Sequence, residues 1–236
     1  ARQPSLSFNY TQVGQENSFT WEAMSEGLTM QVALIAELAR KGDLRVETLE
    51  TTGRWFRKRF PLTPPTAFTV LQDTYDRGNR TVWYNSRYYR ANLWMSREGN
   101  LRFRDIHLFD QRLCSSYLDT PGSGSYFEFT TLPFVDGMLW SRRDVRAALR
   151  IVQLLEDGGS REVAVDGFQV KESGDELIVR VSEKKIGTFS IRLCESDLTV
   201  SASGVPYAWA LELLVPHNDR LPFVAVSPHY VHAIHQ

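Results

Sequence analysis

TVWYNSRYYRANLWM, residues 81–95, holds two tryptophans, three tyrosines and two arginines, and it decides the fold class. In a β-strand, alternate side chains point to opposite faces. The even positions from Tyr84 to Trp94 would then share one face and the odd positions from Trp83 to Leu93 the other, so both faces would hold aromatic rings. One face must be a sandwich core, and we expect the odd face to be the core because it ends in apolar residues.

The even face combines flat apolar rings with hydrogen-bonding side chains, which is the chemistry of a saccharide site. Rings can stack on the C–H face of a pyranose, whereas amides and guanidinium groups can bind its hydroxyls. The candidate substrate-binding residues in and near this stretch are Tyr84, Arg87, Tyr88, Arg90, Trp94 and Asp110. The alternative is that the preceding part of the chain packs on this face.

From residue 80 onward, short β-rich runs follow one another with turn signals between them. SREGN at 96–100 separates the opening stretch from LRFRDIHLF, and ESGD at 172–175 separates two later runs. VRAALRIVQLL at 145–155 could form a helix, but its neighbours favour a strand. About ten to twelve strands at this spacing predict a mostly β chain with an antiparallel β-sandwich over residues 80–236.

Residues 1–75 have a different pattern, in which β-rich runs alternate with two amphipathic helical segments. The β-rich runs are residues 5–11, 44–48 and 67–73. Thr20 suits the N-cap and Gly42 the C-cap of the first helix, and Pro61 ends the second. Alternating strands and helices predict parallel βαβ units. We expect this short α/β segment to be either the end of a larger α/β barrel or a small layer packed against the sandwich.

Four ionisable residues are candidates for catalysis. LRFRDIHLF places Asp105 and His107 on one strand face with Phe103, and a carboxylate there could orient the imidazole for acid–base work or bind a metal with it. A structural ion pair is the alternative. Glu47 and Asp73 lie at the ends of expected strands of the α/β segment, where barrel enzymes place functional residues, and paired carboxylates are what glycoside hydrolysis requires.

Composition argues against several kinds of partner. With 27 Lys and Arg against 28 Asp and Glu, the chain lacks the basic excess of nucleic-acid binders. No apolar run approaches the roughly 18 residues of a membrane span, so we expect neither partner. Cys114 and Cys194 are too far apart and too few for a disulfide framework. His229, His232 and His235 have no cysteine or acidic residue placed to complete a metal site, and we expect no cofactor.

The order WYNSRYYRANLW, LRFRDIHLFD and LPFVDGMLW resembles the later part of large bacterial carbohydrate-active proteins. In these, a (β/α) barrel of glycoside-hydrolase or polysaccharide-deacetylase type precedes a β-sandwich. The resemblance implies a carbohydrate hydrolase whose sandwich shapes a saccharide site, with an earlier part of the same chain as a partner. The Asp-Asp and His-x-x-x-His motifs of the deacetylases are absent, so no catalytic residue is carried over. The alternatives are a non-catalytic carbohydrate-binding or structural sandwich, or a small enzyme that uses Asp105 and His107.

Overall fold

The computed structural model describes most of the chain and divides it into two units. The described residues are 4–11, 19–73, 75, 77–124, 131–183, 186–216, 221–227 and 230–233. Tyr10–Thr63 form a helical unit, whereas Ala1–Asn9 and Pro64–Gln236 form the second unit, a β-sandwich. The chain is mostly β, with antiparallel sheets preceded by a short helical segment. The predicted fold class is thereby confirmed.

The helical unit contains two helices with the predicted capping residues. Helix α1 (Trp21–Lys41) starts after Thr20, whose hydroxyl accepts a hydrogen bond from the Ala23 amide. It ends at Gly42, which has a left-handed φ of 76° that residues with a Cβ rarely adopt. Helix α2 (Leu49–Arg59) ends just before Pro61. Neither helix has a buried residue, so these helices do not form a core of their own.

The strands predicted for the first 75 residues are mostly absent, and this part of the prediction is wrong. Residues 44–48 form no strand, and residues 5–11 contribute only an isolated bridge between Leu6 and Thr66. The third run does form a strand, β1 (Thr66–Val70), but β1 pairs antiparallel with β2 (Arg80–Asn85) in the sandwich. There is therefore no parallel βαβ unit in the described residues.

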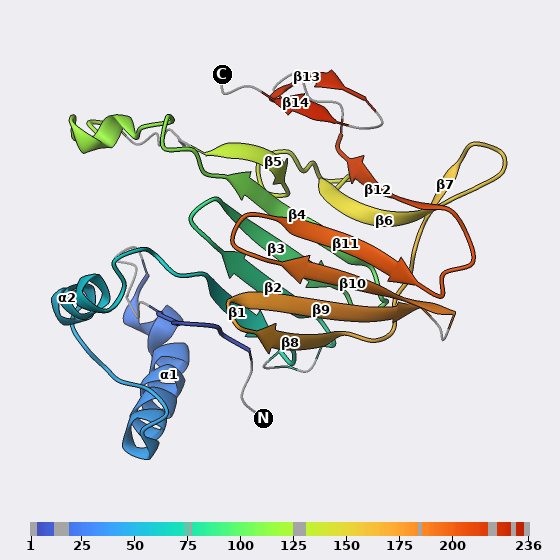
Figure 1. The fold of residues 1–236 in the computed structure, drawn as a ribbon. Helices are drawn as coiled ribbons and strands as arrows, with labels where there is room; N and C mark the ends of the chain where they lie inside the picture. Colours follow the sequence, from blue (N-terminus) through green and yellow to red (C-terminus); the bar gives the residue numbers. More distant parts are fainter. Residues whose placement is uncertain are drawn as a thin grey trace. The chain divides into compact units, whose positions relative to one another are not determined.

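Two antiparallel sheets form the sandwich (Figure 1). The large sheet follows the order β1, β2, β3 (Tyr89–Met95), β4 (Leu101–Leu108), β6 (Ala148–Leu154) and β12 (Trp209–Leu214). Off this path, β5 (Leu132–Asp136) pairs with β4, and β7 (Ser160–Glu162) pairs with β6. The small sheet has the order β11 (Leu198–Ser203), β10 (Gly187–Leu193), β9 (Glu176–Glu183) and β8 (Gln169–Ser173). A short 3₁₀ helix (Ser116–Leu118) and the pair β13 (Phe223–Val226) and β14 (Val231–Ala233) complete the described elements.

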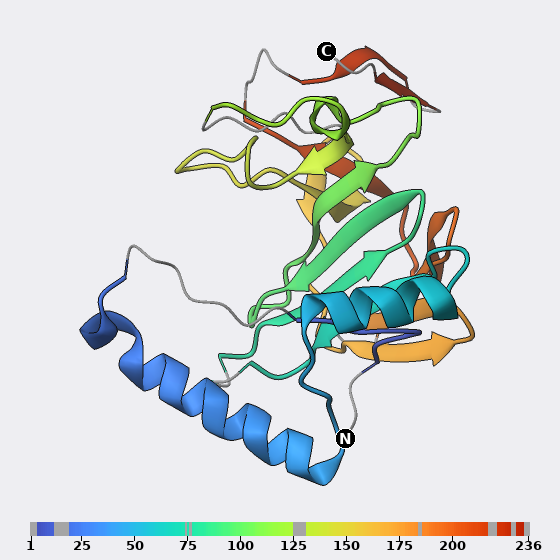
Figure 2. The same cartoon turned by 90° about the vertical axis from the view of Figure 1, so that its left-hand side faces the viewer.

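The core lies between the two sheets, which Figure 2 shows from the side. Its apolar side chains come from alternate positions of both sheets, for example Leu93 and Phe103 of the large sheet and Phe189 and Ile191 of the small one. Each such fully buried side chain contributes roughly 1.5 to 3 kcal/mol relative to exposure. The segment 145–155, expected to be a strand, contributes β6 to this core.

The stretch that decides the fold is two strands rather than one, so the single-strand prediction is wrong. A tight turn at residues 86–88 separates β2 from β3. The Ser86 hydroxyl accepts hydrogen bonds from the amides of Tyr88 (3.1 Å) and Tyr89 (3.2 Å), which stabilises the turn. Across the turn the parity changes, so that even positions of β2 and odd positions of β3 point into the core. Tyr84 is therefore 0% exposed, and a ligand on the surface cannot reach its ring.

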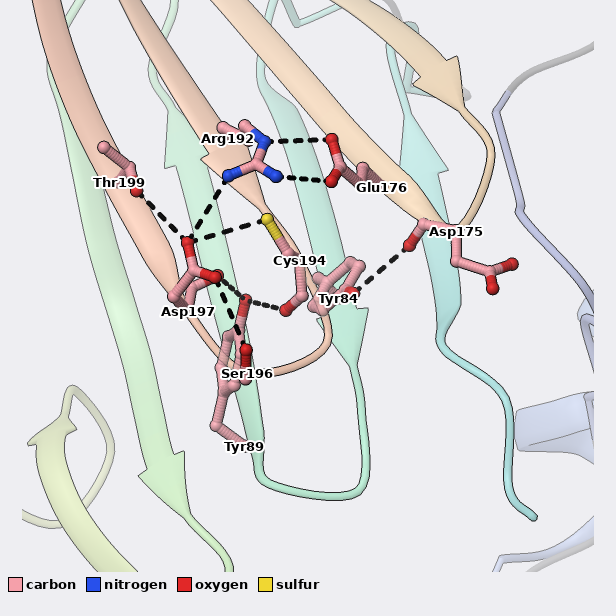
Figure 3. A network of polar contacts seen from close by, with 9 residues as sticks. All are labelled: Tyr84, Tyr89, Asp175, Glu176, Arg192, Cys194, Ser196, Asp197 and Thr199. Carbon is pink, nitrogen blue, oxygen red and sulfur yellow. Dashed lines mark hydrogen bonds and ion pairs between the residues drawn. The ribbon is translucent and has the colours of Figure 1, made fainter.

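The two buried tyrosines connect the sheets at the end of the sandwich (Figure 3). The Tyr84 hydroxyl donates to the Asp175 carbonyl (3.3 Å), and the Tyr89 hydroxyl contacts the carbonyls of Cys194 (2.8 Å) and Asp197 (2.9 Å). Burial, followed by the Asp197 carboxylate, raises the pKa of the Cys194 thiol to about 11. The thiol is therefore neutral near pH 7, and this polar network is a structural one that joins turns of the small sheet to the large sheet.

Candidate functional site

The outward face of the large sheet, which points away from the small sheet, holds three aromatic side chains. In the strand register Phe68 of β1 is opposite Trp83 of β2, and Trp94 of β3 is diagonal to Trp83. Directly opposite residues on neighbouring antiparallel strands point to the same face, and diagonal neighbours remain within reach of each other. Phe68 is 47% exposed, and both tryptophans are partly exposed. We call Phe68, Trp83 and Trp94 the aromatic face.

Next to the aromatic face, β4 contains a β-bulge. Asn92 is opposite Asp105 and Leu93 is opposite Phe103, so Arg104 has no partner residue on β3. A bulge of this kind reverses the alternation of side chains beyond it. Phe103 thus points into the core while Asp105 and His107 both point outward. The prediction that Phe103 shares their face is wrong, whereas the prediction that Asp105 and His107 lie together is confirmed.

The bulge also positions a cation over one of the aromatic rings. The Arg104 guanidinium carbon lies 5.2 Å from the centre of the Trp94 ring, a cation–π distance. Arg104 is exposed. Its donors are therefore available to a ligand that binds beside the tryptophan.

A polar cluster lies on the same outward side. Arg90 donates two hydrogen bonds to Asp105, at 2.9 and 3.1 Å. The His107 Nε2 atom lies 3.5 Å from Asp105 Oδ2 and 3.3 Å from Asp136 Oδ2, and its Nδ1 lies 2.7 Å from the Thr131 hydroxyl. We call Arg90, Asp105, His107, Thr131 and Asp136 the histidine cluster.

Asp136 is ionised in this cluster despite its burial. Its Oδ1 atom accepts hydrogen bonds from the amides of Met138 (2.9 Å) and Leu139 (2.7 Å). Burial alone raises the pKa of Asp136, but the His107 imidazole and these two amides together hold that pKa below its usual value. The carboxylate therefore stays charged near neutral pH and faces the imidazole.

The histidine cluster is enclosed, which limits the chemistry that it can do. His107 is only 3% exposed, and both of the carboxylates around it already accept hydrogen bonds from other groups. Its Nε2 atom has no aligned hydrogen bond within the described residues, although two carboxylates are near it. His107 is therefore enclosed between two carboxylates, out of reach of a ligand on the surface.

The other two candidate catalytic carboxylates make local contacts and belong to different units. Glu47, in the helical unit, accepts a hydrogen bond from Thr52 and pairs with Arg45. Asp73, in the sandwich unit, accepts hydrogen bonds from the amides of Tyr75 and Arg77 in a turn. The Arg77 amide is the main cause that lowers the pKa of Asp73.

The remaining candidate binding residues lie at the turn between β2 and β3. Arg87 donates to Glu195 (2.7 Å), and its guanidinium carbon lies 5.2 Å from the centre of the Tyr88 ring, which is 48% exposed. The Phe109 amide donates to the Tyr88 carbonyl, so Asp110 follows close to this turn. The Arg112 side chain lowers the pKa of Asp110 to about 2. Arg87, Tyr88 and Asp110 are thus grouped apart from Trp94.

No family model, curated protein or solved structure matches this chain. The histidines expected not to bind metal lie partly outside the described residues, since His229 and His235 are not described and His232 lies in β14. Among the residues that the structure describes, no group of three His, Cys, Asp or Glu side chains is placed to hold a metal ion. No helix among the described residues is both long enough and apolar enough to cross a membrane.

Several residues of this face were not identified from the sequence. They are Phe68, Trp83, Arg104, Thr131 and Asp136. The odd-face prediction puts Trp83 in the core because the turn at residues 86–88 contains neither Gly nor Pro, and Phe68 falls in a run expected to belong to the α/β segment. Asp136 reaches His107 only through the pairing of β4 with β5, a contact that no local pattern predicts.

Proposed function

We propose that the sandwich binds a carbohydrate on the outward face of its large sheet, without hydrolysing it. The observation that supports this proposal is the aromatic face. Partly exposed aromatic side chains on adjacent strands are unusual on a solvent-facing sheet surface, and we expect their rings to form an apolar platform for a ligand. Such platforms suit the C–H faces of pyranose rings, while nearby polar groups bind the hydroxyls.

The three rings of the aromatic face differ in how accessible they are for stacking with a sugar. Because Arg104 already lies over the Trp94 ring, a sugar would stack on Trp83 and Phe68 rather than on Trp94. Arg104 would then donate hydrogen bonds to hydroxyl groups at the edge of the sugar. The hydroxyl of Thr81, opposite Trp94 on the same face, accepts a hydrogen bond from the Asn92 side chain (2.8 Å) and donates one to the Leu93 carbonyl (3.2 Å), so both of these bonds already engage it within the sheet.

Binding is favoured over glycoside hydrolysis by the state of the carboxylates on this face. A glycosidase needs one carboxylic acid and one carboxylate that face the scissile bond from opposite sides. Asp105 is held by Arg90 through two hydrogen bonds, and Asp136 is buried behind His107. The resemblance to carbohydrate-active proteins fits the same proposal, with this sandwich as the accessory domain that holds the polysaccharide.

The proposal is tested by a glycan array followed by titration of tryptophan fluorescence with the oligosaccharides that bind. Trp83→Ala should weaken binding about fivefold to tenfold, since an aromatic stacking contact contributes roughly 1 kcal/mol beyond area burial. Trp21→Ala removes another exposed tryptophan, on helix α1, and should leave the affinity unchanged. Thermal unfolding of each variant confirms that the sandwich is intact.

Two results would contradict the proposal. One is the absence of any response to neutral, acidic and amino oligosaccharides at millimolar concentration. The other is a glycan that binds Trp83→Ala as tightly as the unchanged chain. In the first case the aromatic face has a structural role, and in the second the glycan binds elsewhere on the chain.

A further inference from the structure

Among the residues that the structure describes, the small sheet ends at β11, an edge strand that lacks the usual protection. Its sequence LTVSAS contains no charged residue and no proline, and its pairing with β10 shows no bulge. Exposed edge strands of natural sheets generally contain a charged residue, a proline or a β-bulge, and each of these prevents another strand from pairing with the edge. At the other edge of the small sheet the Glu172 side chain accepts hydrogen bonds from the amides of Ser5 and Leu6, so a segment of the chain lies there.

The hairpin from β10 to β11 determines which backbone groups of β11 are free. The Cys194 amide donates to the Asp197 carbonyl (2.9 Å), so this pair is a hydrogen-bonded one. Hydrogen-bonded and non-hydrogen-bonded pairs alternate along antiparallel strands. Thr199, Ser201 and Ser203 therefore direct their N–H and C=O groups toward β10. The groups of the alternate residues point away from the sheet, and these residues are Leu198, Val200 and Ala202.

Beyond β11, the large sheet offers an apolar surface for a further strand. β6 and β12 continue past β11 in Figures 1 and 2. On β12, Leu211 is opposite Ile151 and Leu213 is opposite Leu149, so both point to the core side. Leu211 is nevertheless 39% exposed and Leu213 is only partly buried. The small sheet thus leaves part of the inner face of the large sheet uncovered.

We propose that the β11 edge binds an extended peptide segment of another protein by β-strand addition. The N–H and C=O groups of Leu198, Val200 and Ala202 hydrogen-bond to the added strand. The apolar side chains of the peptide, at every second position, cover Leu211 and Leu213. Its other side chains lie beside Thr199 and Ser201 on the outer surface and are polar.

A peptide fits this edge better than a second copy of the chain does. If β11 paired antiparallel with β11 of a second copy, the large sheets of both copies would lie on the same side of the joined small sheets. The large sheet of the second copy would then clash with β6 and β12, which extend beyond β11 on that side. A single strand has no such second layer. The linker from Gly204 to Ala208 joins β11 to β12, so it closes one end of the site, and the peptide enters from the other.

Amide hydrogen exchange measured by NMR tests the proposal on the unchanged chain. The probe is an end-blocked hexapeptide of alternating valine and threonine. It should slow exchange at Leu198, Val200 and Ala202 at least tenfold, while Thr199 and Ser201, already bonded to β10, serve as internal references. Uniform exchange rates with and without saturating peptide would overturn the proposal.

Val200→Pro provides the matching variant. Because the Val200 N–H points away from β10, proline removes a donor for the peptide without removing a hydrogen bond of the sheet. This variant should lose the slowed exchange at Leu198 and Ala202, whereas Val200→Thr, which keeps the N–H, should retain it. Equal protection by the peptide in Val200→Pro would refute the edge as the site. If the unchanged chain sediments as a dimer and Val200→Pro is a monomer, the occupant of the β11 edge is a second copy of the chain, and the peptide proposal is wrong.

Discussion

At the scale of single residues, Asp136 connects the end of β5 to the buried imidazole of His107. Because the folded-state pKa of Asp136 is lowered, its contribution to stability is present above the unfolded-state value of 3.8 and is lost as the pH falls through the lower folded-state pKa. Asp136→Asn keeps a side-chain oxygen for the Met138 and Leu139 amides but removes the charge beside His107.

We expect Asp136→Asn to lower the free energy of unfolding at pH 7 by about 2 kcal/mol, the range of a hydrogen bond to a charged group. The difference from the unchanged chain should shrink as the pH falls below 3.8 and should disappear once the pH has passed the lower folded-state pKa, where the carboxylate of the folded chain becomes protonated. Urea unfolding at a series of pH values measures both effects. A difference that stayed constant down to pH 2 would mean that the charge of Asp136 does not contribute.

Residue-level prediction succeeded where the partners were close in sequence. Asp105 and His107 are two positions apart, so a strand pattern was enough to place them on one face. The same pattern failed for Tyr84, because a serine side chain rather than a glycine or proline forms the turn that changes its direction. Thr131 and Asp136 come from another segment, and only the pairing of β5 with β4 brings them to the imidazole.

At the scale of elements, the turn between β3 and β4 depends on a glycine in close contact with another segment. Gly99 has a positive φ of 88°, and a Cβ added there would lie 2.1 Å from the Val165 carbonyl oxygen. Gly174, in the turn between β8 and β9, also has a positive φ, of 61°, but a Cβ there would meet no atom within 4 Å. An alanine at Gly174 therefore introduces backbone strain alone, whereas an alanine at Gly99 introduces backbone strain and a steric clash.

Gly174→Ala should therefore destabilise the sandwich by about 1 kcal/mol, the cost of a left-handed backbone with a Cβ. Gly99→Ala should cost about 3 kcal/mol or more, because the Val165 backbone must also move. Thermal or urea unfolding of the two variants gives the comparison. Equal losses would show that segment 163–165 can shift freely and that it does not fix the turn.

Elements were predictable where side-chain periodicity was regular. The caps of α1 at Thr20 and Gly42 and the strand β6 follow from sequence pattern. The strand expected at 44–48 was wrong because a short run of alternating apolar residues forms a strand only when a neighbouring strand is available to pair with it. Residues 44–48 have no such neighbour among the described residues.

At the scale of the whole molecule, the helical unit is inserted between two parts of the sandwich unit. Residues on both sides of it, Leu6 and Thr66, form a bridge, and the Ala67 amide donates to the Ser5 carbonyl (3.2 Å). The two ends of the inserted segment therefore lie near each other. The antiparallel sandwich was predictable from the spacing of its strands, but the insertion of the helical unit was not. The part of the sandwich that precedes the helical unit has only a few residues, and their β pattern is weak.

We expect a chain in which a short Gly-Ser linker replaces residues 10–63 to keep the sandwich fold. Neither helix has a buried residue, so the free energy of unfolding of the sandwich should change by no more than about 1 kcal/mol. Urea unfolding and the amide NMR spectrum of β2 and β3 measure the effect. Loss of cooperative unfolding in the shortened chain would show that the helices are needed for the sandwich core.

The hydrogen bond from the Ser5 amide to Glu172 spans 167 positions of the chain. During synthesis, residues 4–9 can pair with Thr66 at the start of β1 before β8 has been made, but they can bond to Glu172 only after most of the sandwich has emerged. The same segment lies against β8 once folding is complete. The contact with Glu172 thus forms late, and a chain that stops before β8 leaves the Ser5 and Leu6 amides without this partner.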